Sequence, residues 1–182
     1  MLLTGNRVFM AASFMAAASV VLTSPASAHV TIAQKQASVD SHYQAVLRVP
    51  HGCQGAATTA IRVRVPEGLI GVKPQPKPGW SLETVNGKYA RAHTRHGAHV
   101  TEGVKEIIWS GGRLLDEHYD EFVFVGHLSS NLKPDTTVYF PVVQECEQGI
   151  ARWIDIPTEG AKPASDHSDS PAPGLKLLPK QP

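Results

Sequence analysis

The feature that most constrains the fold is a series of short segments in which apolar and polar residues alternate. Residues 59–65 read Thr-Ala-Ile-Arg-Val-Arg-Val, a period of two that is typical of a strand with one buried face. Other segments of strand length are rich in β-branched or aromatic residues: 43–49, 105–109, 121–128, 137–143 and 151–156. Gly- and Pro-containing turns separate them, and no window has the pattern of a helix of three turns. The sequence therefore predicts an all-β fold.

Strands of this length with regular Gly and Pro punctuation favour a single antiparallel β-sandwich, immunoglobulin-like or cupredoxin-like, over residues 29–159. Asn86-Gly87 predicts a tight hairpin turn. Pro141 lies inside a predicted strand, which indicates an edge strand or a bulge at that point. Residues 160–182 are rich in Pro, Ser, Asp and Lys, so we expect a flexible tail there.

Residues 1–28 have the three parts of a secretory signal peptide. Arg7 supplies a positive charge, residues 8–22 are apolar, and Ala26-Ser27-Ala28 places small residues where signal peptidase cleaves. The apolar run is about 15 residues long, which is shorter than the roughly 20 that a membrane-spanning helix needs. We therefore expect cleavage before His29 rather than retention as an anchor, and a periplasmic or secreted mature protein.

The mature chain is electrically balanced. The sequence has 17 Lys and Arg residues against 16 Asp and Glu residues, and Arg7 is the only charged residue of the signal segment. The chain therefore lacks the excess of positive charge that is typical of nucleic-acid-binding proteins. The mature sequence also has no polybasic patch and no second apolar run that would bind a membrane. We expect neither a nucleic-acid partner nor a membrane span after signal cleavage.

Cys53 and Cys146 are the two cysteines of the chain. An even number of cysteines in an oxidising compartment predicts a disulfide. A metal or redox site built on thiolates is the alternative, and the absence of a CxxC spacing argues against it.

Cleavage before His29 would create a chelating residue. Its α-amine and the Nδ1 atom of its own imidazole are able to close one ring on a metal ion. Two nitrogen donors suit Cu(II), which also stands at the top of the affinity order for divalent ions. The alternative is a histidine that follows the signal peptide without any role in metal binding.

Several stretches of the sequence also resemble the YcnI-like family of exported copper-binding proteins, in the same order and with similar spacing. They are His29-Val30-Thr31, Val49-Pro50, residues 58–68, Pro78-Gly79-Trp80, residues 107–112, residues 120–124 and Arg152-Trp153. The resemblance covers nearly all of the predicted domain. Many members of that family carry a C-terminal membrane anchor, which this sequence does not show.

The resemblance implies a β-sandwich that holds one Cu(II) through a brace with a single histidine. Carried over to this sequence, the metal site comprises His29, the carboxylate of Glu121, and Trp153 close to the ion. Asp120, beside Glu121, is the competing carboxylate. The alternatives are a solvated acid for Glu121 and a core aromatic for Trp153.

His93, His96 and His99 recur every three residues, which resembles a metal-binding tract. A spacing of three aligns these side chains on neither a helix nor a strand. Flanking Arg and Gly residues favour an exposed loop, so we expect surface histidines without an assigned role.

No catalytic set is apparent, and we expect a copper carrier rather than an enzyme. Its role would be copper storage, delivery or tolerance, with the copper ion and other copper-handling exported or membrane proteins as partners. Two alternatives stay open. One is an oxidative copper enzyme with a second histidine ligand from His42, His118 or His127. The other is a sandwich that binds a protein or glycan without metal.

Overall fold

The computed structural model describes residues 29–95, 97–157 and 170–181, so the predicted signal peptide and His96 lie outside the described residues. In chain order the strands are β1 (Thr31–Ile32), β2 (Gln36–Ser38), β3 (Ser41–Val49), β4 (Thr58–Arg64), β5 (Leu69–Pro74), β6 (Ser81–Arg95), β7 (Ala98–Leu114), β8 (Asp120–Leu128), β9 (Thr137–Tyr139), β10 (Val142–Cys146), β11 (Ile150–Trp153) and β12 (Gly174–Leu178). The described ranges contain no helix that could cross a membrane.

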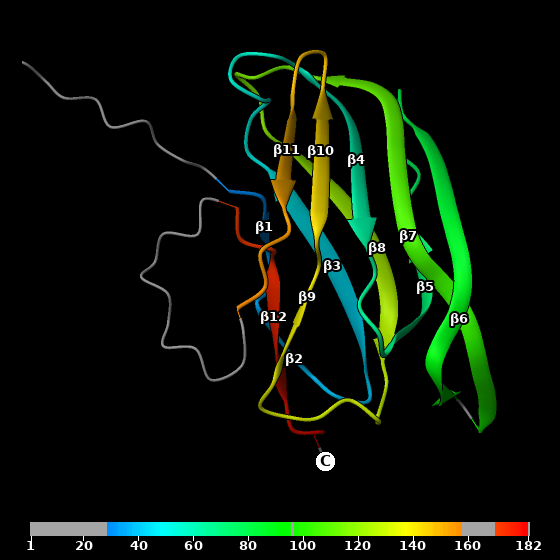
Figure 1. The fold of residues 1–182 in the computed structure, drawn as a ribbon. Helices are drawn as coiled ribbons and strands as arrows, with labels where there is room; N and C mark the ends of the chain where they lie inside the picture. The colour runs from blue at the N-terminus through cyan, green and yellow to red at the C-terminus, as the bar shows by residue number, and fades with distance from the viewer. Residues whose placement is uncertain (1–28, 96, 158–169, 182) are drawn as a thin grey trace, which may run out of the picture.

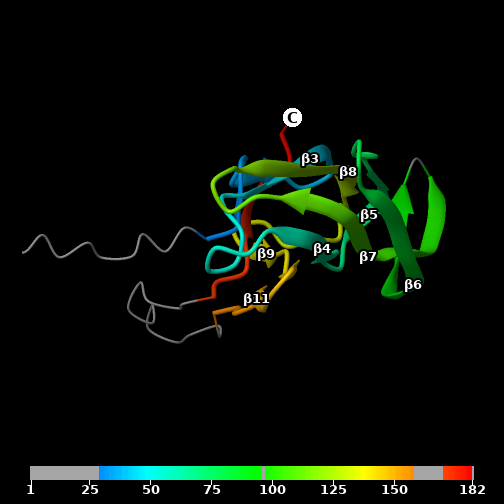
Figure 2. The same ribbon diagram turned by 90° about the horizontal axis from the view of Figure 1, so that it is seen from above.

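The strands form three sheets (Figure 1). One sheet has the order β1-β3-β8-β5 and a second has the order β11-β10-β4-β7-β6. Viewed along the strands, β3 and β8 lie in one layer and β4 and β11 in the other (Figure 2). A short third sheet has the order β2-β12-β9, with β12 parallel to β2 and antiparallel to β9. The predicted all-β sandwich is confirmed.

Alternate residues of the central strands fill the space between the two large sheets. The four-stranded sheet contributes Ala45 and Leu47 from β3 with Phe122 and Phe124 from β8, and the five-stranded sheet contributes Ile61, Val63, Ile107, Trp109 and Val142. Each of these side chains is at most 1 % exposed. The period of two in the sequence thus corresponds to one face of each strand turned toward the core.

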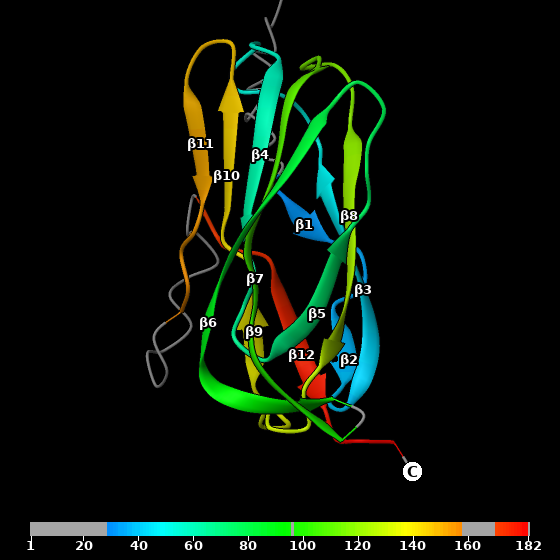
Figure 3. The same ribbon diagram turned by 90° about the vertical axis from the view of Figure 1, so that its right-hand side faces the viewer.

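The predicted hairpin at Asn86-Gly87 is wrong. Strand β6 continues through these residues, with Asn86 opposite Val104 and Gly87 opposite Gly103 on β7. The chain reverses instead between Arg95 and Ala98, where Gly97 has a φ of 79°. The long pairing of β6 with β7 therefore overrides the local turn preference, with a register irregularity between Val85 and Asn86. Figure 3 shows this long hairpin beside β5.

Pro141 marks the point where the chain changes sheets. The predicted strand over residues 137–143 is divided into β9, in the three-stranded sheet, and β10, in the five-stranded sheet. The Pro141 carbonyl accepts a hydrogen bond from the Arg64 amide at 2.9 Å, but proline has no amide hydrogen to give in return. The sequence predicted an edge strand or a bulge here, but Pro141 lies in neither strand: the predicted strand breaks into two at this residue.

The expected flexible tail over residues 160–182 is wrong for its last part. Residues 174–178 form β12, the middle strand of the three-stranded sheet, and Leu175 and Leu177 are 0 % exposed. These leucines lie two apart and share the buried face of the strand. The Pro- and Ser-rich composition of the whole segment conceals this short alternating pattern.

The predicted disulfide joins Cys53 to Cys146. It connects the loop after β3 to the end of β10, two segments 93 residues apart in the sequence. In the chain-entropy model a bridge across so long a loop contributes roughly 4–5 kcal/mol to the free energy of unfolding. A disulfide of this kind is compatible with an exported protein.

Two leucines of β12 offer a test of its contribution to the core. Leu177→Ala should lower the free energy of unfolding by about 2–5 kcal/mol, because it leaves a cavity in a fully buried position. Leu178→Ala removes the same atoms from a half-buried position in the same strand and should cost clearly less. Urea denaturation of both variants measures the difference. Equal and small losses would show that β12 does not belong to the cooperative core.

Candidate metal-binding site

His29 and Trp153 come together from edge strands of the two large sheets. His29 lies two residues before the first residue of β1, and Trp153 is the last residue of β11. Their ring centroids are 5.4 Å apart, with an angle of 69° between the ring planes. Trp153 is 7 % exposed and belongs to the core, whereas His29 is half-buried. The first residue of the expected mature chain therefore lies against a fixed aromatic side chain.

Gln144 on β10 fixes the indole of Trp153. Trp153 Nε1 donates a hydrogen bond of 3.1 Å to Gln144 Oε1. The Gln144 amide nitrogen donates in turn to the His51 carbonyl at 2.8 Å and to Thr58 Oγ1 at 2.7 Å. Gln144 is 1 % exposed, and its hydrogen bonds offset the cost of burying an amide. The side chain thereby links β11, β4 and the loop that follows β3.

The disulfide strengthens the same region. Thr58 Oγ1 lies 3.7 Å from Cys146 Sγ, and Cys53 is two residues beyond His51. His51 Nδ1 is 2.6 Å from the Gly52 carbonyl and 3.9 Å from Asp116 Oδ1. His51 is thus a histidine that sequence reasoning did not select, although the loop carrying it is connected through Gln144 to Trp153.

Glu121, the predicted carboxylate ligand, is not brought to His29 and Trp153. Its Oε1 atom forms an ion pair with Arg48 Nε at 2.9 Å on the surface of the four-stranded sheet. Arg48 is the register partner of both Glu121 on β8 and Thr31 on β1, so β3 lies between Glu121 and β1. The competing carboxylate, Asp120, accepts a hydrogen bond of 2.6 Å from Lys77 Nζ.

The residues present fit a Cu(II) site in part. His29 would supply an α-amine and an imidazole, and Trp153 provides a rigid wall beside that imidazole. Over the described ranges, no three His, Cys, Asp or Glu side chains are placed to hold one metal ion. The arrangement therefore provides a chelating terminus on a firm support, and further ligands would come from water or from a side chain that moves.

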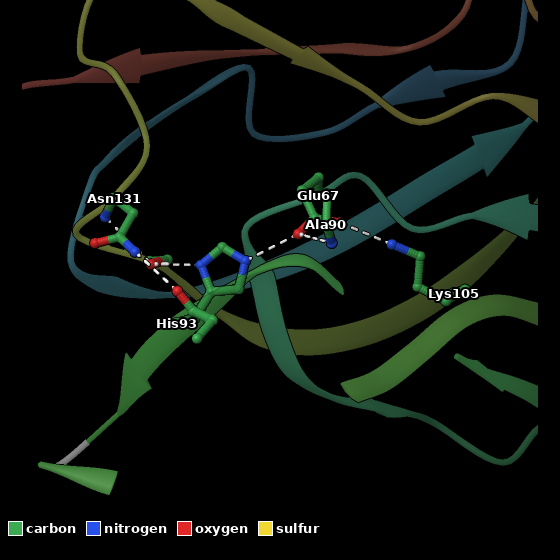
Figure 4. Close-up of polar contacts among 7 residues, drawn as sticks. Glu67, Ala90, His93, Lys105 and Asn131 are labelled. Atoms are coloured by element: carbon green, nitrogen blue, oxygen red, sulfur yellow. Dashed lines mark hydrogen bonds and ion pairs between the residues drawn. The ribbon is translucent and has the colours of Figure 1, made fainter. Parts of the chain in front are cut away.

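The expectation that His93 is a surface residue is wrong, whereas His99 is exposed as expected. His93 lies on β6 and is 2 % exposed. Its Nε2 atom is 3.0 Å from Glu67 Oε1, and its Nδ1 atom is 3.1 Å from Ser129 Oγ (Figure 4). Glu67 also accepts hydrogen bonds from Lys105 Nζ and from the Ala90 amide. The network attaches the β6–β7 hairpin to the loops after β4 and β8.

Ser129, His93 and Glu67 are connected in the order of a hydrolase triad, a relation that spans three separate segments and is not visible in the sequence. Ser129 is 0 % exposed, and its hydroxyl oxygen also accepts a hydrogen bond from the Asn131 amide. No substrate can reach this oxygen in the structure. Partial burial disfavours ionisation of Glu67, but hydrogen bonds from Lys105 and His93 outweigh it and hold the pKa of the carboxyl below its usual range. The network is a structural clamp.

Gln144 is a site residue whose burial the sequence pattern could have revealed. Val142 and Gln144 are two apart in a strand, so they share a face, and that face is buried. A polar residue at a position where the alternation of the strand places apolar residues indicates a buried hydrogen-bonding group. Its partners cannot be read from the sequence.

A double-mutant cycle tests the hydrogen bond that fixes the indole. Gln144→Leu should lower the free energy of unfolding by at least about 2 kcal/mol, because it leaves the buried Trp153 N–H and the His51 carbonyl without this partner. Trp153→Phe in the Gln144→Leu background should cost less than in the native background, since the unpaired N–H is then absent. Additive losses in urea denaturation would contradict a coupling between the two side chains.

Comparisons with known proteins identify the fold and the family. Among solved structures, the chain is similar to an uncharacterized protein from Nocardia farcinica whose crystal structure reveals an immunoglobulin-like fold. The two chains are 22% identical with a TM-score of 0.59, over 82% of this chain and 98% of that one, which supports the fold alone. A comparison with curated proteins finds no match.

A family model described as "Domain of unknown function (DUF1775)" matches residues 29–177, from the candidate metal ligand into β12. The chain therefore belongs to the DUF1775 family.

Proposed function

We propose that this protein is an exported copper-binding protein that holds one Cu(II) through His29, in copper storage, delivery or tolerance. The observation that carries the proposal is the packing of the His29 imidazole against Trp153, with 5.4 Å between ring centroids. The match to the DUF1775 family over residues 29–177 agrees with the resemblance to YcnI-like copper-binding proteins. Other copper-handling exported or membrane proteins are the proposed partners.

The donor chemistry favours Cu(II) over Cu(I). After cleavage before His29, the mature chain would contain no methionine, and both cysteines are joined in a disulfide. Soft sulfur ligands for Cu(I) are then lacking, whereas an amine and an imidazole suit Cu(II). Because the terminal amine and the imidazole belong to one residue, a single cleavage event creates both donors.

Trp153 and Gln144 would support the ion without supplying a strong ligand. An indole N–H is a donor only, and here it is engaged with the Gln144 side-chain carbonyl. The ring would limit the approach of water on one side of the imidazole and hold His29 in orientation. Outer partners of this kind commonly change metal affinity and redox behaviour.

Glu121 is proposed as the carboxylate ligand on the resemblance alone. To reach an ion at His29, its carboxylate would have to leave Arg48. That ion pair is solvent-exposed, and exposed pairs contribute only about 0–1 kcal/mol, so its loss would oppose such a movement weakly. The distance between the strands is the larger obstacle, because β3 separates Glu121 from β1.

Removing the imidazole tests the brace. Intact mass should first show that the exported protein begins at His29 and that His29→Ala is cleaved at the same bond. His29→Ala keeps the α-amine but removes the second nitrogen of the chelate ring, and it should weaken Cu(II) binding by more than about 100-fold, since losing an outer-shell partner alone costs 10–100-fold. His99→Ala, at an exposed histidine outside the site, is the matched control. Unchanged affinity in His29→Ala would refute the brace, and a chain that starts elsewhere would remove its basis.

Glu121 and Arg48 provide a matched pair that tests the ligand assignment. If Glu121 binds the ion, Glu121→Gln should alter the electron paramagnetic resonance spectrum of bound Cu(II), and its affinity loss should be smaller than that from His29→Ala. Arg48→Gln breaks the same ion pair but leaves the carboxylate, and should keep the native spectrum. Identical native spectra for both variants would assign Glu121 to the surface ion pair only.

A further inference from the structure

Two histidines form a cross-strand pair on the four-stranded sheet. His42 on β3 and His127 on β8 are register partners, so their side chains project from the same face of the sheet. Their ring centroids are 5.4 Å apart, and the ring planes make an angle of 71°. Neither residue belongs to the proposed single-histidine brace at His29 or to the clamp around His93.

The separation of the two rings suits shared coordination of one ion. A zinc–imidazole bond is about 2.0–2.1 Å long, which places each ring centre about 3.2 Å from the ion. Two such rings at a tetrahedral angle are about 5.2 Å apart, centre to centre. The observed distance of 5.4 Å is close to this value, so rotation of the His42 ring, rather than movement of the strands, would complete the geometry.

His127 is oriented as metal-binding histidines commonly are. Its Nε2 atom lies 3.2 Å from Asp40 Oδ1, and Lys180 Nζ lies 2.6 Å from Asp40 Oδ2. The Asp40 carboxylate, which is also paired with Lys180, is placed to accept the Nε2 hydrogen of His127. A carboxylate that fixes one ring nitrogen leaves the other nitrogen with its lone pair available to a metal.

That other nitrogen has no partner among the described residues. His127 Nδ1 is buried and makes no hydrogen bond. An unpaired buried acceptor is unfavourable, and a bound ion would satisfy it. The ring of His42 is exposed and lines an open hollow of about 450 Å³, together with Asp40 and Lys180. An ion would enter from this hollow as the His42 ring turns.

We propose that His42 and His127 form a second metal site, which binds a divalent transition-metal ion with a preference for imidazole, with water in the remaining positions. Zn²⁺ is the probe of choice because it accepts two imidazoles and open positions. His42 is the second residue of β3, whereas Thr31, two residues after His29, pairs with Arg48, six residues further along β3, which is roughly 20 Å of strand. This site is independent of the proposed Cu(II) brace.

The test uses the His29→Ala protein, so that the terminal chelate does not contribute. Zn²⁺ titration by calorimetry should show one binding event, and nitrogen-15 spectra of the histidine rings should show a shift at His127 Nδ1. His42→Ala, at an exposed position, should weaken Zn²⁺ binding at least tenfold. Asp40→Asn, which keeps the shape of the side chain, should weaken it about 10–100-fold.

His99→Ala and His118→Ala are the matched controls, since both residues are exposed and neither belongs to the pair. Thermal unfolding of each metal-free variant confirms that it is folded. Absence of Zn²⁺ binding, or binding that His42→Ala leaves unchanged, overturns the proposal. Loss of binding in His99→Ala instead would move the site to the β6–β7 hairpin and also overturn it. None of these outcomes depends on whether the native chain holds Cu(II) at His29.

Discussion

The hydrogen bonds of Gln144 are the constraint on which the candidate copper site depends. An amide in the core is tolerated only when its polar atoms are paired, and its pairing with Trp153, His51 and Thr58 fixes three segments relative to one another. Without Gln144 the buried indole N–H would lack this hydrogen-bond partner, which is unfavourable. The disulfide at Cys146 prevents the same segments from separating. The position of the terminal histidine is therefore set from the interior of the sandwich.

The fold could be predicted wherever the alternating pattern was long enough to be read. Residues 59–65 and 121–128 correspond closely to β4 and β8 because burial of one strand face is recorded directly in the residue order. The pattern failed where long-range pairing overruled local preference, as at Asn86-Gly87, which the register with β7 keeps extended. It also failed for β12, since two leucines within a polar segment contribute little to its average composition.

The candidate site could be predicted less completely, because its parts meet through tertiary contacts. The sequence and its family resemblance singled out His29 and Trp153, and the structure places their rings in contact. Glu121 lies in the expected strand, but which side chain it faces depends on the strand order, and here it faces Arg48. The burial of His93 depends on how the long hairpin is attached to other loops, which a spacing of three residues cannot reveal.

The central place of β12 has a consequence for the order of events during biogenesis. β12 lies between β2, near the start of the domain, and β9, so the three-stranded sheet closes only when the carboxyl end of the chain is present. If the chain is exported amino end first, as proposed, it cannot complete this sheet until its last residues have left the translocation channel. Folding of the domain would then finish only after translocation. A chain that stops before residue 174 would leave β2 and β9 as unpaired edges, the kind of surface that promotes aggregation.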